Sequence, residues 1–133
     1  MKTITNFGIG MVGLMCQYVN DSDIATLTFI SSDLINNAAY IPTKTIIIPT
    51  DRAIVNLLNE LHKIDFDIKD TITTFGVGIT GIICQYFSTD ENVGLIIGEG
   101  MLNKSTTITI NGTDSIERLI YKLENIVEGL DEN

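Results

Sequence analysis

Two glycine-rich segments are the part of this chain whose residue types and spacing most suggest chemistry. Each matches G-x-G-x-x-G, a pattern that in dinucleotide-binding proteins joins a buried strand to a helix and holds a pyrophosphate on backbone amides. The residues after each glycine run are instead rich in β-branched and aromatic side chains, which favours a strand. The glycines could then bend a strand, or expose amides as a small anion-binding nest. The pattern is formed by Gly8, Gly10 and Gly13, and again by Gly76, Gly78 and Gly81.

A Cys-Gln-Tyr triplet follows each glycine run. The Gln amide could hydrogen-bond, and the Tyr ring could stack, on a base or another ring. The alternative is a structural role, in which the amide satisfies a neighbouring strand and the ring packs at the edge of a core. Gln17, Tyr18, Gln85 and Tyr86 therefore join the six glycines as candidate ligand-binding residues.

Catalytic and metal-binding chemistry has less support than binding. Cys16 and Cys84 occupy equivalent places, but no Cys-x-x-Cys motif is present, so a zinc site is not predicted. His62 is the one histidine, and hence the one imidazole that could activate a Cys or Ser nucleophile. We expect two buried cysteines acting as small apolar side chains, and a disulfide between them stays open. We predict no cofactor and no metal, and we favour a binding protein over an enzyme.

These residues belong to an internal repeat. Residues 4–23 and 72–91 are identical at nine of twenty positions. Such self-similarity predicts two copies of one unit related by a pseudo-twofold axis. Repeat one covers residues 1–66 and repeat two covers residues 69–130, within a single domain of residues 1–133. The offset between copies falls from 68 residues early to 62 residues late, so the second copy has a shorter loop before its last strand.

Each copy is predicted to be four strands followed by an amphipathic helix, which gives an α+β fold with antiparallel sheets. A helix over residues 11–20 stays open as an alternative. Residues 31–43 are expected to form a loop, and the shorter loop of the second copy contains Gly98, Gly100 and Asn103. The expected strands of the two copies are residues 3–7, 11–19, 24–30 and 44–48, then 71–75, 79–87, 93–97 and 106–110. The expected helices are residues 52–64 and a segment whose apolar stripe runs from residue 116 to residue 127.

The charge distribution limits the kinds of partner. Eight basic residues are scattered among 17 acidic ones, and the formal charge is −9. This balance argues against a basic groove that follows a phosphate backbone, so nucleic acid is possible but disfavoured. Residues 3–20 and 71–89 are almost uncharged, and two helices cannot easily cover all of the surface that these strands expose. We therefore expect a homo-oligomer. The absence of a signal peptide and of a long apolar segment predicts a cytoplasmic protein without a membrane partner.

The segments KTIIIPTDRAIVNLLNELHKI and TTITINGTDSIERLIYKLENIV each contain a strand, a turn with a capping residue and an amphipathic helix. With four strands before each helix, this order resembles the Pur-alpha repeat family and, more loosely, the Whirly family. The resemblance implies curved four-stranded sheets, helices that pack across the pair, and often a dimer. In those families the sheets bind single-stranded nucleic acid through basic and aromatic side chains, and these strands contain few Lys or Arg.

Three functions follow as expectations. The first is a non-catalytic, self-associating protein that holds a small, nucleotide-like ligand or a protein partner. The Ile- and Asn-rich composition is typical of an AT-rich genome, and such a protein fits a phage or a mobile element. The second is a single-stranded nucleic-acid-binding protein of Pur-alpha-like type. The third is a nucleotide-dependent enzyme that uses the paired glycine runs.

Overall fold

The computed structural model describes residues 2–22, 24–35, 39–99 and 106–131. They form two antiparallel four-stranded sheets and two helices, which confirms the predicted α+β class. In both sheets the strands lie side by side in chain order, and each sheet is followed by one helix. The first sheet contains β1 (Lys2–Phe7), β2 (Leu14–Asp21), β3 (Ile24–Ile35) and β4 (Ala39–Ile48). The second contains β5 (Thr71–Gly76), β6 (Ile82–Ser88), β7 (Val93–Glu99) and β8 (Thr106–Asn111). The helices are α1 (Asp51–Leu61) and α2 (Thr113–Asp131).

The segment after each glycine run is a strand, so the prediction from β-propensity is confirmed and the helical alternative is wrong. The register of the first hairpin matches that of the fifth and sixth strands. Phe7 lies opposite Cys16 in β1 and β2, and Phe75 lies opposite Cys84 in β5 and β6. Successive side chains of a strand point to opposite faces. Each Cys and Tyr of the repeated triplet therefore points inward, and the Gln between them points outward.

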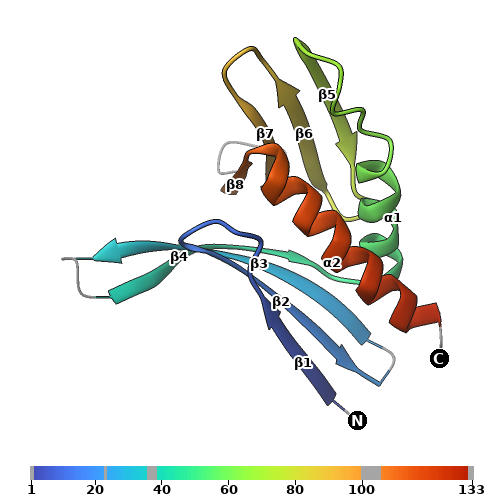
Figure 1. Ribbon diagram of the computed structural model, residues 1–133. Helices are drawn as coiled ribbons and strands as arrows, with labels where there is room; N and C mark the ends of the chain where they lie inside the picture. The colour runs from blue at the N-terminus through green and yellow to red at the C-terminus, as the bar shows by residue number, and fades with distance from the viewer. Residues whose placement is uncertain (1, 23, 36–38, 100–105, 132–133) are drawn as a thin grey trace.

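The two helices lie side by side, with the first sheet below them and the second sheet above them in Figure 1. Helix α1 contacts α2 and β3, whereas α2 contacts β7 and β8. Strand β4 also contacts β7 and β8. Buried side chains from both sheets and both helices form one apolar cluster, which includes Phe29, Ile48, Leu57, Leu95 and Leu119. This shared core positions the loops and faces described below.

Helix α1 begins where its sequence predicts. Thr50 has an extended backbone, and its Oγ1 atom accepts a hydrogen bond of 3.0 Å from the amide of Ala53. The helix ends at Leu61, three residues before the predicted end. The amide of Ile64 donates to the carbonyl of Leu61, three residues earlier, instead of continuing the α-helical pattern. The tighter last turn leads the chain into the linker that precedes β5.

The predicted loop over residues 31–43 is wrong, because β3 continues to Ile35 and β4 begins at Ala39. These extensions pair with one another, and the register shifts between Ser31 and Ser32. Pro42 lies opposite Ser32 on β4, an edge strand, where its missing N–H costs no ladder hydrogen bond. In the second sheet Gly98 lies within β7 and not in the predicted loop, whereas Gly100 and Asn103 lie outside the described residues.

Neither helix in the described part of the chain is long and apolar enough to cross a membrane.

Candidate functional site

The two glycine runs form the turns between β1 and β2 and between β5 and β6. Gly10, Gly13, Gly78 and Gly81 have positive φ angles of 89°, 83°, 58° and 80°, which L side chains rarely adopt. A strand leaves each turn, so these residues do not form the strand–turn–helix arrangement that holds a pyrophosphate. The turns themselves require the four glycines with positive φ, whereas Gly8 and Gly76 have ordinary φ angles and open space around them.

Each glycine turn is contacted by the helix that follows the other sheet. The amide of Gly78 donates a hydrogen bond of 3.0 Å to Oδ1 of Asn56 in α1. Gly10 lies against Arg118 of α2, so closely that a Cβ atom on Gly10 would be 2.7 Å from a guanidinium nitrogen. Asn56 and Arg118 are 62 residues apart, which is the offset between the late parts of the two copies. The sequence analysis missed both residues, although that offset pairs them.

The Gln-Tyr pairs do not converge on one ligand site. Gln17 donates from Nε2 to Oδ1 of Asn6 at 3.0 Å, and Gln85 donates from Nε2 to Oγ1 of Thr74 at 3.4 Å. Both bonds join neighbouring strands on the outer faces of the sheets. Tyr18 and Tyr86 lie on the opposite faces and are buried in the core. The amides and the rings are therefore separated by the thickness of a sheet, and the glycine turns lie at its end.

Both cysteines are free thiols and fully buried. Burial raises the pKa of Cys16 and of Cys84 to about 12, so both thiols are protonated at neutral pH. Burial also raises the pKa of Tyr18, with a smaller contribution from the negative charge of Asp51. A buried, neutral thiol is a poor nucleophile. Within the described ranges, no three His, Cys, Asp or Glu side chains lie close enough together to hold a metal ion.

The outer face of each sheet has a central area without charged side chains, which we call the uncharged face. The residues that form each uncharged face follow from the registers of the strands and from the alternation of their side chains. In the first sheet its members are Ile4, Asn6, Met15, Gln17, Val19, Thr26, Thr28, Ile30, Thr45 and Ile47. In the second they are Ile72, Thr74, Gly76, Ile83, Gln85, Phe87, Gly94, Ile96, Gly98, Thr107, Thr109 and Asn111. Several of the isoleucines are substantially exposed, including Ile4, Ile47 and Ile72.

The second uncharged face is packed around a glycine. The ring of Phe87 lies over Gly94, and a Cβ atom at that position would overlap the ring. Gly94 is buried although it lies on the outer side of β7, because Phe87 covers it. The close approach of the Phe87 ring to Gly94 makes the ring part of this face, together with its Ile and Thr side chains.

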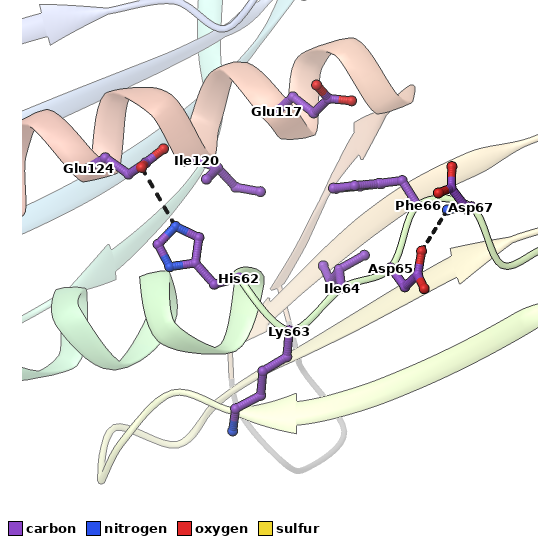
Figure 2. A pocket seen from close by; sticks show the side chains of 9 residues that line it. All are labelled: His62, Lys63, Ile64, Asp65, Phe66, Asp67, Glu117, Ile120 and Glu124. Carbon is purple, nitrogen blue, oxygen red and sulfur yellow. Dashed lines mark hydrogen bonds and ion pairs between the residues drawn. The ribbon is translucent and has the colours of Figure 1, made fainter.

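A cavity of about 680 Å³ lies where the two helices meet the linker. Figure 2 shows His62 at the end of α1 facing Glu124 on α2, with Nε2 and Oε2 3.8 Å apart. Acidic side chains outnumber basic ones in its lining, and both members of the ion pair are about half exposed. The cavity is a polar groove at the surface of the helix pair. Its lining is His62, Lys63, Ile64, Asp65, Phe66, Asp67, Glu117, Ile120 and Glu124.

A second cavity, of about 190 Å³, lies between the end of α1, the linker and the inner face of β5. Tyr86 forms part of its wall, and the edge of one ring meets the face of the other where Tyr86 packs with Phe66, with centroids 5.8 Å apart. The Tyr86 hydroxyl is buried and has no hydrogen-bond partner among the described residues. Such an unpaired buried polar group costs free energy.

No match to this chain was found in comparisons with protein-family models, with curated proteins and with solved structures. The resemblance to Pur-alpha repeats therefore rests on the order of strands and helices.

Proposed function

We propose that this protein is a non-catalytic binding protein that associates with copies of itself through its uncharged faces. One observation carries this proposal: the chain has a net charge of −9, yet the centre of each outer face has no charged side chain. Packing one such face on another buries exposed Ile and Met side chains without removing any charge from water. Because both faces are uncharged and rich in Ile and Thr, each can serve as the partner of the other in a second copy.

The net charge further defines how the copies would meet. Two molecules of charge −9 repel each other, and contact through uncharged faces keeps their carboxylates far apart. Salt screens this repulsion, so self-association should strengthen as the ionic strength rises. Binding to single-stranded nucleic acid has the opposite salt dependence, because it releases counterions from the phosphates.

We also propose that the two ββββα units are related by a pseudo-twofold axis that passes between the helices. The contacts between Asn56 and Gly78 and between Arg118 and Gly10 support it, because each helix reaches the glycine turn of the other unit. Such a relation makes the two uncharged faces counterparts, one on each side of the molecule. A protein with two self-complementary faces can form a chain or a closed ring of subunits.

Isosteric charge substitutions test the association. Gln17→Glu and Gln85→Glu each place one negative charge in the centre of an uncharged face. Sedimentation equilibrium should show an oligomer for the wild type and at least a tenfold weaker association for a variant whose face is used. Asn125→Asp is the matched control, because it adds the same charge on an exposed position of α2. Its association should equal that of the wild type.

Two results would contradict the proposal. One is a wild-type monomer at concentrations of about 100 μM in both low and high salt. The other is salt-sensitive binding of an oligothymidylate probe that Gln17→Glu or Gln85→Glu weakens, which would make the same faces a nucleic-acid surface. An oligomer that none of the substitutions affects would place the interface elsewhere on the chain.

A further inference from the structure

Strand β1 is an edge strand that the fold leaves open. Among the described residues it pairs with β2 alone, and its side chains from Lys2 to Asn6 are all exposed. An edge strand presents a row of backbone N–H and C=O groups with which another strand can pair. Proteins block such edges with charged residues, proline, bulges or a covering segment. β1 has one charge, on Lys2 at its first position, and it has neither a proline nor a register shift.

The other three sheet edges are each blocked. β4 contains Pro42 and Lys44, and its register against β3 shifts beside them. β8 lies against β4. The linker between α1 and β5 runs along β5 in Figure 1, and the linker and β5 together line the cavity of about 190 Å³. Among the described strands, β1 is therefore the one whose edge is open for pairing.

The sequence of β1 is complementary to itself in an antiparallel pair. When two copies of β1 meet about a twofold axis at Thr5, Thr3 lies opposite Phe7 of the second copy, and Ile4 lies opposite Asn6. Threonine pairs, and pairs of an aromatic with a β-branched side chain, stabilise antiparallel strands. This register keeps inner residues opposite inner residues, because side chains alternate between the faces. The two Lys2 residues lie at opposite ends of the pair, so no like charges meet.

The charges around this edge favour a second copy of the chain as the partner. Two chains of net charge −9 repel each other, but β1 has no acidic residue, and its lysine lies opposite Asp21 in its own sheet. Contact along β1 therefore brings no carboxylate of one copy's β1 against the other. Ile4 and Asn6 belong to the uncharged face, so pairing would also set the uncharged faces of two copies side by side.

We propose that β1 pairs with β1 of a second copy, antiparallel and about a twofold axis at Thr5. The two four-stranded first sheets then form one continuous sheet across the axis. This contact goes beyond the packing of uncharged faces and does not depend on it. Thr5 lies on the same side of β1 as Phe7, which packs against the core, whereas the uncharged face is on the other side.

Cysteine cross-linking tests the register. Directly opposite residues of antiparallel strands have Cα atoms about 4.5–5.5 Å apart, which a disulfide can span. The full chain with Thr5→Cys should therefore form a covalent dimer on oxidation with copper phenanthroline. Thr73→Cys is the matched control, because Thr73 is also exposed and holds the same place in β5, beside the linker. The Thr5→Cys dimer should form at least about tenfold faster. Cys16 and Cys84 are buried and should not react.

Thr5→Lys tests the same contact without a cross-link. It places two like charges opposite each other at the axis, so sedimentation equilibrium should show association weakened by at least about tenfold. Thr73→Lys should associate as the wild type does. The proposal is overturned if Thr5→Cys cross-links no faster than Thr73→Cys, or if Thr5→Lys associates as strongly as the wild type.

The edge and the uncharged faces can fail separately. An oligomer that Gln17→Glu or Gln85→Glu dissociates, and that Thr5→Lys leaves intact, would contradict pairing through β1 and support the faces. An oligomer that Thr5→Lys dissociates, and that both glutamate variants leave intact, would support pairing through β1 and contradict the faces. A wild-type chain that stays monomeric would overturn both.

Discussion

The Nε2 atom of His62 lies 3.8 Å from Oε2 of Glu124, and the proposed repeat makes these two residues counterparts. His62 follows α1 directly, and Glu124 lies 62 residues later in α2. A residue that touches its own counterpart must lie close to the axis that relates them. This contact therefore supports the proposal that a pseudo-twofold axis passes between the two helices, at the groove that Figure 2 shows.

The energy at this axis should come from apolar packing and not from the ion pair. His62→Gln and Glu124→Gln should each change the free energy of unfolding by less than about 0.5 kcal/mol, because exposed pairs are screened by water. Leu61 and Leu123 are fully buried equivalents one residue earlier. Leu61→Ala and Leu123→Ala should each cost roughly 2–4 kcal/mol. Urea unfolding measures all four, and an ion-pair variant that costs as much as a leucine variant contradicts this view.

Three glycines drawn from the two patterns should differ in their tolerance of alanine. At Gly8 the φ angle is ordinary and no atom lies within 4 Å of an added Cβ, so Gly8→Ala should be close to neutral. Gly81→Ala meets no neighbour but must adopt a positive φ, which costs about 1–2 kcal/mol. Gly13→Ala also has a positive φ, and its Cβ would lie 2.8 Å from the carbonyl oxygen of Ser32. It should cost roughly 1–3 kcal/mol more than Gly81→Ala.

Circular dichroism melts would rank these three variants. Equal losses at Gly8 and Gly13 would show that neither φ nor the contact with Ser32 governs the turn. If Gly81→Ala lost as much stability as Gly13→Ala, the contact with the Ser32 carbonyl would have no measurable effect. The positive φ would then account for both losses.

The pattern of side chains predicted the sheets better than their connections. The β-branched residues after each glycine run identified β2 and β6, and the turn with a capping residue identified the start of α1 to within one residue. The long hairpin of β3 and β4 was missed because its Ser, Asn and Pro residues are typical of loops. These residues can pair there because β4 is an edge strand and because the register shifts at Ser31. Local β-propensity predicts neither the edge position nor the register shift.

The candidate site was predicted less well, and the reason is tertiary. Asn56 reaches Gly78 only because α1 packs beside the turn of the other unit, and no local pattern contains that distance. The Gln and Tyr of each pair are neighbours in sequence, but successive side chains of a strand point to opposite faces of the sheet. The position of Tyr86 beside a cavity depends on where the linker passes, which the sequence leaves undetermined.

Buried hydroxyl groups with and without partners should respond in opposite directions. The Oγ atom of Ser88 is fully buried and has no partner among the described residues, so Ser88→Ala should raise the free energy of unfolding by about 1 kcal/mol. The Oγ1 atom of Thr80 donates to the carbonyl of Val77 at 2.6 Å and accepts from the amide of Ile82 at 3.1 Å. Thr80→Val keeps the shape and should cost roughly 1–2 kcal/mol.

Urea titrations of these two variants and of the wild type give both differences under one condition. A destabilised Ser88→Ala would mean that the hydroxyl has a favourable contact in solution. A neutral Thr80→Val would show that the turn does not depend on its two hydrogen bonds.

The two buried thiols should make the protein sensitive to alkali. Their pKa is about 12 in the folded chain and 9.0 in the unfolded chain, so the unfolded chain loses its thiol protons first as the pH rises. The stabilisation from each neutral thiol is complete below pH 9 and is lost between pH 9 and 12, at up to about 1.4 kcal/mol per pH unit.

A double variant with Cys16→Ala and Cys84→Ala removes this loss. At pH 7 it should be less stable than the wild type by about 1–2 kcal/mol for each site, because small cavities remain. The advantage of the wild type should shrink above pH 9 and reverse its sign before pH 11, because the two thiols together lose up to about 2.7 kcal/mol per pH unit. Urea midpoints at pH 7, 9, 10 and 11 measure this difference. The two proteins differ only at the two cysteine positions, so the contributions of all other groups cancel in the difference. A gap that stays constant over this range would show that the folded thiols ionise as readily as the unfolded ones, and rapid alkylation of the native protein by iodoacetamide at pH 8 would show the same.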